Sequence, residues 1–217
     1  MRIRVEQRAF ADNEWVHRYA VAFANLYRDA FENYESGRLD RVPKSWRLAF
    51  DAAKAGTGLV LQDMFLGVNA HVNNDLPIAL TSISIDPDRQ ARYRDHNAVN
   101  AVLAAVTDRA SERIAALYAP GLTTLDDCAG QLDEMISLFS LDVARDSAWE
   151  SAVALTNSRN DVERRFASTM IGARAAGMAR LLLAPSRNQQ LVSACRRLES
   201  GVQWLDLIDS VLTPAHG

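Results

Sequence analysis

One short stretch of the chain, residues 67–77, carries most of the side chains that could do chemistry. It reads GVNAHVNNDLP and places His71 and Asp75 four residues apart. In an α-helix, side chains with this spacing share a face and can contact a common atom. Imidazole and carboxylate are donors for zinc or iron, and a carboxylate can also orient a histidine as an acid or base. The spacing therefore predicts either two metal ligands or an acid–base pair.

A metal ion needs more donors than one pair supplies. The candidates elsewhere are His17, near the start of the chain, and the neighbours Asp95 and His96. We assign a divalent ion such as zinc, iron or manganese to His71, Asp75 and His17. The predicted catalytic residues are His71, Asp75 and Asp95, and either Asp95 or His17 would complete the metal shell.

The same stretch holds a second polar pair, Asn69 and Asn73, on a segment whose other residues are mostly apolar. Buried polar groups without partners cost about 1–3 kcal/mol each, so these side chains predict either a satisfied network or a binding site. Pro77 lacks the N–H that would bond the Asn73 carbonyl, and a kink is expected there. The freed carbonyl could serve a ligand or a neighbouring helix.

Aromatic and cationic residues outside this stretch complete the candidate site. Arg145 and Trp149 are four residues apart on a predicted helix, so the guanidinium could stack on the indole or hold an anionic group. A surface ion pair is the alternative for Arg145. Trp46 follows Pro43 and could line a pocket, although a core position is equally compatible with the pattern.

The elements that must position these residues are helices. Apolar residues recur at steps of three and four, and alternating strand patterns are nearly absent. The predicted helices cover residues 13–33, 43–54, 57–80, 89–118, 124–141, 142–155, 161–183 and 187–212. We therefore predict an all-α fold, one domain over residues 1–217, built as a bundle of seven or eight helices. The Ala- and Gly-rich part of the seventh helix could form a homodimer seam or an internal contact.

Composition narrows the classes of function. The chain has 217 residues, 24 basic and 27 acidic, for a net charge of −3, which argues against nucleic-acid binding. Its two cysteines, Cys128 and Cys195, are too few for a disulfide framework, which favours a reducing cytoplasm. No stretch resembles a signal peptide or a membrane span. The expected partner is a small-molecule substrate.

The string NAHVNNDLP resembles the N-A-H-[IV]-N-x-D-L-P signature of a family known only as a domain of unknown function, number five-nine-nine-five. Shorter matches follow the same order at residues 23–30, 42–50, 95–100 and 144–149. The resemblance implies an all-α fold and no particular activity. It marks eight candidate site residues: His71, Asp75, Asn69, Asn73, Asp95, Asn100, Arg145 and Trp149. His96 departs from the pattern, which has an apolar aromatic residue there.

Three functions remain open. In the first, a metal-bound water attacks an ester or phosphoester while Arg145 holds the anionic group. In the second, a metal-free lyase, isomerase or cyclase uses His71 oriented by Asp75, with the substrate held by Trp46, Trp149, Asn69, Asn73 and Asn100. In the third, the chain is a non-enzymatic module that binds a ligand or partner, and the polar cluster only stabilises the fold.

Overall fold

The computed structural model describes residues 10–56, 58–122 and 140–184, with scattered positions between 193 and 209. Within them every regular element is helical and no strand occurs, which confirms the all-α class. The elements are α1 (Asn13–Glu35), the 3₁₀ turn η1 (Leu39–Arg41), α2 (Lys44–Ala55), α3 (Val60–Asn69), the π-helix η2 (Ala70–Asp75), α4 (Leu76–Ser82), α5 (Arg89–Leu122), α7 (Leu141–Thr156) and α8 (Asp161–Leu182). The helix predicted at 124–141, most of the one at 187–212 and both cysteines lie outside the described residues.

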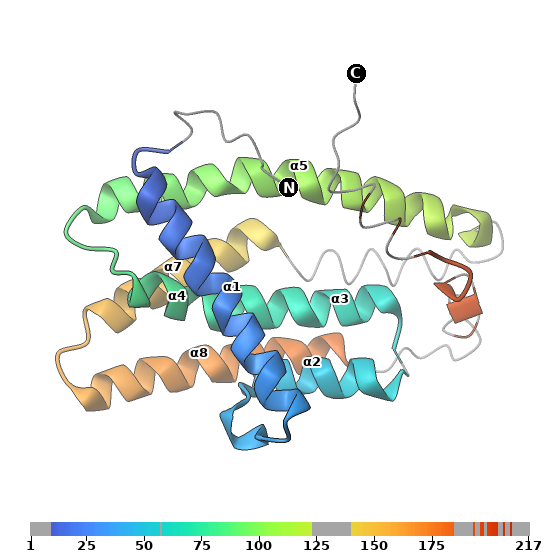
Figure 1. Cartoon of the computed structure of the whole chain (residues 1–217), viewed down its shortest axis with the longest axis horizontal. Helices are drawn as coiled ribbons and strands as arrows, with labels where there is room; N and C mark the ends of the chain where they lie inside the picture. Colours follow the sequence, from blue (N-terminus) through green and yellow to red (C-terminus); the bar gives the residue numbers. More distant parts are fainter. Residues whose placement is uncertain are drawn as a thin grey trace.

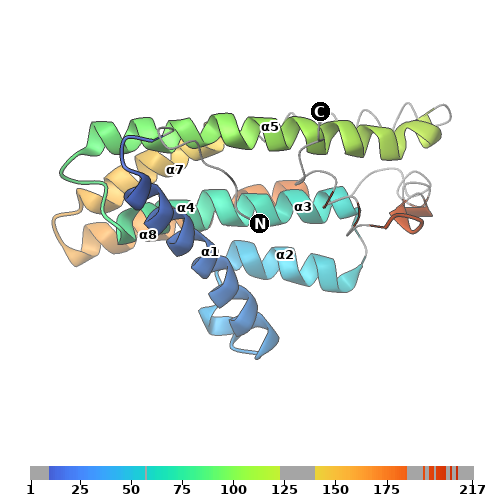
Figure 2. The same cartoon turned by 45° about the horizontal axis from the view of Figure 1, so that its top comes forward.

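The rod formed by α3, η2 and α4 runs through the middle of the molecule (Figure 1). The long α5 lies along one side of this rod, α2 and α8 lie on the other, and α1 crosses the bundle steeply (Figures 1 and 2). The short η2 contacts α1, α2, α7 and α8 as well as its neighbours α3 and α4. The π-helix, which carries His71 and Asp75, therefore contacts most of the other helices.

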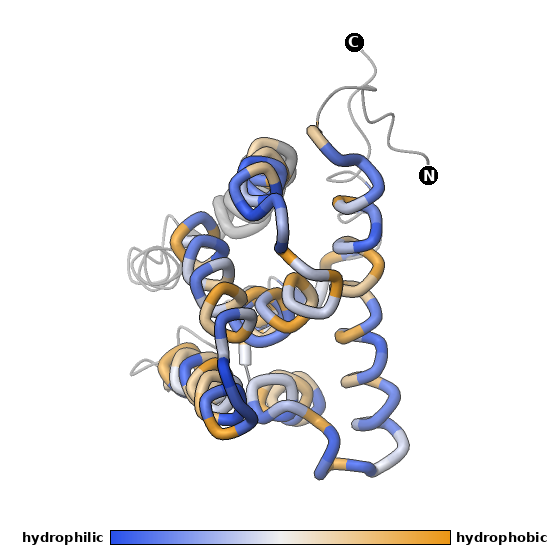
Figure 3. The backbone as a smooth tube through the Cα atoms, turned by 90° about the vertical axis from the view of Figure 1, so that its left-hand side faces the viewer, coloured by the Kyte–Doolittle hydropathy of each residue, from blue (hydrophilic) through white to orange (hydrophobic). Residues whose placement is uncertain are grey.

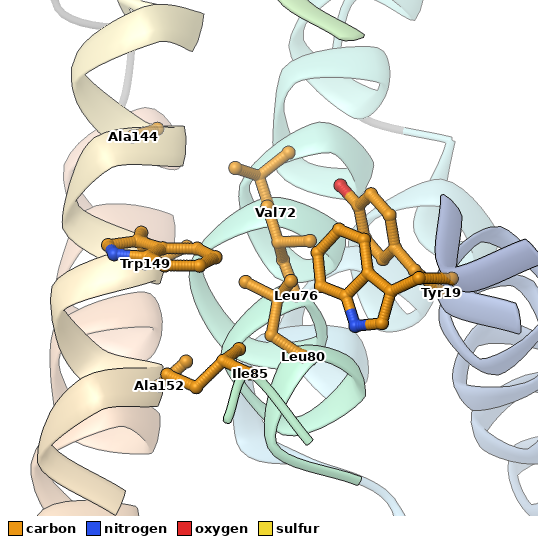
Figure 4. Packing of buried hydrophobic residues seen from close by; sticks show 10 residues of the cluster. Tyr19, Val72, Leu76, Leu80, Ile85, Ala144, Trp149 and Ala152 are labelled. Carbon is orange, nitrogen blue, oxygen red and sulfur yellow. The ribbon is translucent and has the colours of Figure 1, made fainter. Parts of the chain in front are cut away.

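Apolar side chains hold this central rod between α1 and α7. Figure 4 shows Trp149 of α7 on one side of Val72 and Leu76, and Tyr19 of α1 on the other. Leu76 is fully buried, and Trp149 is 4% exposed. Burying one such side chain stabilises a fold by about 1.5–3 kcal/mol, so this cluster fixes the rod in place.

Local sequence signals begin and end several helices. The Asp12 side chain accepts a hydrogen bond from the backbone N–H of Trp15 at 2.8 Å, and Asn160 caps the first turn of α8 in the same way. Gly56 ends α2 with a φ of 58°, a left-handed conformation that glycine adopts without strain. Orange and blue alternate along the helices in Figure 3, as amphipathic helices require. None of the described helices is both long and apolar enough to cross a membrane.

The predicted helix over 57–80 is interrupted by the π-helix η2 instead of by a simple kink at Pro77. The chain continues through six π-helical residues, and the Leu76 N–H bonds the His71 carbonyl five residues back. Pro77 follows in the first turn of α4, where a missing N–H is tolerated. In an α-helix the proline ring would press on the Asn73 carbonyl, and the wider π turn relieves this clash. Such π turns are frequent at functional sites.

Candidate functional site

The carboxylate of Asp75 is the centre of the site. It is 2% exposed and its Oδ2 lies 3.0 Å from Nδ1 of His71. The indole N–H of Trp46 donates to the same Oδ2 at 2.7 Å, and the Asn74 amide donates to Oδ1 at 2.9 Å. The His71–Asp75 pairing that the sequence predicts is thus present, and two further donors hold the carboxylate.

These contacts fix which nitrogen of His71 carries the hydrogen. A carboxylate only accepts hydrogen bonds, so Nδ1 must donate and the lone pair of the neutral ring lies on Nε2. Among the described residues Nε2 has no hydrogen-bond partner. The His71 side chain is 27% exposed, so this basic nitrogen belongs to a ring that solvent or a ligand can reach.

Aromatic rings surround the imidazole. Phe23 stacks on it with ring centroids 3.5 Å apart and an angle of 11° between the planes. Tyr27 meets the ring edge-on at 6.1 Å and Trp46 lies 5.9 Å away. Phe23 and Tyr27 were not among the predicted site residues because they belong to the apolar stripe of α1, and such a stripe indicates only a buried face. Their spacing of four residues and their place in the family-like match at residues 23–30 are the sequence signals that could have found them.

Asn69 and Asn73 form a structural pair within the fold. The Asn69 amide donates to the carbonyl of Ala175 in α8 at 2.9 Å, and the Asn73 amide donates to Asn69 Oδ1 at 3.0 Å. Asn69 is fully buried and Asn73 is 6% exposed. These bonds tie α3 and η2 to α8, so each of the two amides uses an N–H group for helix packing.

Arg145 lies in a second polar cluster. It is 2% exposed, and its guanidinium donates to the Tyr19 hydroxyl at 3.1 Å, to the His96 carbonyl at 2.7 Å and to Asn100 Oδ1. Its recorded partners in the described part of the chain are all neutral. The guanidinium is thus engaged on several sides within the fold, and the surface ion pair that the sequence offered as an alternative is not found among the described residues.

Residues 1–185 match a family model described as "Family of unknown function (DUF5995)". The chain belongs to this family. No curated protein and no solved structure matches it. All the site residues of this DUF5995 protein discussed so far lie within the matched region.

His96, the departure from the family pattern, is a buried neutral histidine in this DUF5995 protein. Burial chiefly, and the Arg145 charge in addition, lower the pKa of His96 from its usual 6.5 to about 3. Its Nδ1 faces the Arg145 guanidinium at 3.3 Å and its Nε2 faces the Arg145 carbonyl at 3.3 Å. The ring therefore serves as a neutral partner of Arg145.

Asp95, a predicted catalytic residue, contacts the start of α1. Its two oxygens accept hydrogen bonds from the backbone N–H groups of Ala11 at 2.7 Å and Asp12 at 2.9 Å. Phe23, which stacks on His71, lies eleven residues further along α1, or roughly 16 Å at 1.5 Å per residue. Asp95 thus anchors the start of α1, and the structure does not bring it to His71.

Trp149 and His17 also lie away from His71. The Trp149 ring packs in the core beside Tyr93 at 5.1 Å and His96 at 5.4 Å. His17 is exposed on α1. In the described part of the DUF5995 chain no three His, Cys, Asp or Glu side chains cluster as metal ligands. The donors present therefore do not fit the metal shell that the sequence suggested.

Two surface hollows of about 440 Å³ each lie along α8. The first is lined by residues of α4, α7 and α8, including Thr81 and Arg165, and the second by residues of α7 and α8, including Phe166 and Met170. Neither is lined by His71 or Asp75. The chemistry-bearing pair and these hollows are thus separate features of the DUF5995 fold.

Proposed function

We propose that this DUF5995 protein is a metal-free enzyme of the lyase, isomerase or cyclase class that moves a proton on a small-molecule substrate. His71 is the acid–base group and Asp75 orients it. The observation that carries the proposal is the 3.0 Å contact between Asp75 Oδ2 and His71 Nδ1. It leaves Nε2 as an unpartnered base, among the described residues, on a ring that is 27% exposed.

The simplest reaction for this pair is an isomerisation. Nε2 removes a proton from a carbon beside a carbonyl, and the electron pair of the broken C–H bond forms an enolate. The imidazolium that results is stabilised by the Asp75 carboxylate, which accepts a hydrogen bond from its Nδ1–H and is not itself protonated. When a C=C double bond adjoins the deprotonated carbon, the enolate is a dienolate. Nε2 then returns the same proton to the γ carbon and the double bond moves next to the carbonyl, so that no co-reactant is needed.

Metal-assisted hydrolysis of an ester or phosphoester has less support. His71 Nδ1 and Asp75 bind each other, Asp95 binds the backbone, and His17 is exposed on α1. These donors do not converge on one point where zinc, iron or manganese could lie. Arg145, the residue expected to hold an anionic group, is 2% exposed and engaged by neutral groups.

A non-enzymatic binding module is the second candidate, and one observation favours it. Both hollows of about 440 Å³ lie along α8 rather than at His71. In that reading the Asp75 and Asn69 networks only stabilise the helices, and a ligand or partner binds along α8. Replacement of His71 would then lower stability without changing any binding at α8.

The expected setting follows from the sequence. We place the protein in the cytoplasm because two cysteines in 217 residues do not suggest an extracellular disulfide scaffold. The net charge of −3 supports a small molecule rather than a nucleic acid as partner. Ala175, Ala176 and Ala179 of α8 are 0%, 1% and 0% exposed within the single chain, which supports internal packing of this face over a homodimer seam.

The protonation pattern of His71 tests the proposal directly. Nitrogen-15 NMR of histidine-labelled protein should show Nδ1 protonated and Nε2 unprotonated, with His71→Gln used to assign the signals. Asp75→Asn should weaken this preference, and diethyl pyrocarbonate should acylate His71 more slowly in that variant. A proton on Nε2 in the neutral ring would contradict the proposal. So would a stoichiometric metal, measured by plasma mass spectrometry, that is lost on replacement of His71.

A further inference from the structure

Beside His71 the surface carries a strip of aromatic rings, defined here as Tyr27, Phe31 and Phe50. Tyr27 and Phe31 lie one turn apart on α1 and stack with centroids 6.2 Å apart, and they are 43% and 44% exposed. Phe50 of α2 borders both rings, at 6.5 Å from Tyr27 and 5.8 Å from Phe31. The strip continues to His71, because Tyr27 lies 6.1 Å from the imidazole.

Two features set this strip apart from ordinary surface residues. Single exposed apolar side chains are common on soluble proteins, whereas contiguous exposed apolar patches often mark binding sites. Here the rings are contiguous and adjoin the His71 ring, whose Nε2 has no hydrogen-bond partner among the described residues. The Tyr27 hydroxyl likewise has no hydrogen-bond partner recorded within the described residues, so it can donate to or accept from a ligand.

Each of two arginines next to the strip, one on α1 and one on α2, lies close to an acidic side chain. Arg28 lies 3.7 Å from Glu32 on α1, and Arg47 lies 3.8 Å from Asp51 on α2. The nearest buried cation of the predicted site, Arg145, is engaged by neutral groups and is 2% exposed. A charged ligand would therefore find no unpaired counter-charge among these groups, whereas a neutral one needs none.

We propose that Tyr27 and Phe31 form the surface on which the substrate lies, and that the substrate is a neutral, planar, unsaturated molecule. This inference rests on the proposed function, because it takes His71 as the group that acts on the bound molecule. A flat ring gains from stacking on Tyr27 and Phe31. Its polar group then lies near the Tyr27 hydroxyl and His71 Nε2, which supply hydrogen bonds.

Binding of a simple probe tests this surface. The probe is 2-naphthol, which is planar and neutral, and its comparison is 2-naphthoate, which has the same rings and a negative charge. Titration by NMR would follow the indole N–H of Trp46, which is bonded to Asp75 beside His71. The variants are Tyr27→Leu and Tyr27→Phe. The comparison is Phe166→Leu, an aromatic residue 68% exposed on α8 that lines the second hollow, so its replacement reports any binding of the probe at that hollow instead.

We expect 2-naphthol to bind more tightly than 2-naphthoate and to shift the Trp46 signal. Tyr27→Leu should raise the Kd about 3- to 10-fold, the worth of one aromatic pair. Tyr27→Phe keeps the ring and should change the Kd less than Tyr27→Leu does, and Phe166→Leu should not change it. No binding by the native protein, tighter binding of 2-naphthoate, or equal losses for Tyr27→Leu and Phe166→Leu would each overturn the inference.

The same measurements separate this inference from the proposed function. Binding that depends on Tyr27 and persists in His71→Gln would support the aromatic surface by itself. The Nε2–H form of neutral His71 would contradict the catalytic role without affecting that binding. Conversely, the expected protonation of His71 with no 2-naphthol binding would keep the acid–base proposal and overturn the substrate class.

Discussion

A single carboxylate oxygen organises the site at the scale of the residue. Asp75 Oδ2 accepts hydrogen bonds from both Trp46 and His71, at 2.7 and 3.0 Å. The sequence left Trp46 as a residue of either a pocket wall or the core; it is 4% exposed, and its ring lies 5.9 Å from His71. Its indole N–H has a second role, because a buried Trp usually bonds its nitrogen to a partner. Trp46 is thus a positioning residue that acts on His71 through Asp75.

Replacement of Trp46 should reveal this role. Trp46→Phe keeps an aromatic ring that can pack on Phe50, whose ring lies 5.1 Å away, but removes the N–H donor. Loss of one partner of a buried carboxylate costs about 1–3 kcal/mol. We expect a fall of that size in the free energy of unfolding by urea, together with slower acylation of His71 by diethyl pyrocarbonate.

The control for this prediction is Trp149→Phe. It removes the same volume from the core, but Trp149 packs beside Tyr93 and His96 instead of bonding Asp75. Equal effects of the two substitutions on the reactivity of His71 would show that Trp46 contributes only packing.

At the scale of the element, the asparagine pair joins the π-helix to α8. Asn69→Ala would remove the side-chain bond to the Ala175 carbonyl and leave the Asn73 amide without its recorded partner. Because all three groups are buried, we expect a loss of about 1–3 kcal/mol in the free energy of unfolding. Asn13, which is exposed in the first turn of α1, serves as the comparison, and Asn13→Ala should change stability by no more than about 0.5 kcal/mol. A loss as small for Asn69→Ala would mean that other groups hold η2 to α8.

The elements also show what the sequence could and could not predict. Helical spacing predicted that His71 would reach Asp75, and that pair is found because a spacing of four is set by the helix alone. The positions of Asp95 and Arg145 depend on contacts with residues 84 and 126 positions away. No local spacing encodes such contacts. The same holds for Phe23, whose stacking on His71 requires α1 to cross the rod at one particular angle and height.

For the molecule as a whole, His96 makes stability depend on pH. Its pKa in the folded protein is about 3, below the usual 6.5, because the ring is buried beside the Arg145 charge. The unfolded chain therefore takes up a proton between pH 6.5 and pH 3 that the folded protein does not. Above pH 6.5 this proton uptake does not affect the free energy of unfolding. As the pH falls below 6.5, the free energy of unfolding decreases by up to about 1.4 kcal/mol per pH unit.

Urea unfolding at pH 7, 6 and 5 would measure this slope. His96→Phe removes the titrating group and should make the dependence on pH shallower over that range. His17→Gln removes an exposed histidine from α1 and provides the comparison. Identical slopes for the native protein and His96→Phe would show that other groups govern acid unfolding.

The π turn limits which deletions the sequence of this chain can tolerate. A turn closed by a bond between residues five apart holds one residue more than an α-helical turn, so it sets the rotational phase of all that follows in the rod. Deleting one residue there would rotate α4 by about 100° relative to α3. Leu76 and Leu80, which are fully buried, would leave the core as the turn beside His71 became regular. The packing of the core and the geometry of the candidate site therefore depend on the same residue, and the extra residue cannot be lost without changing both.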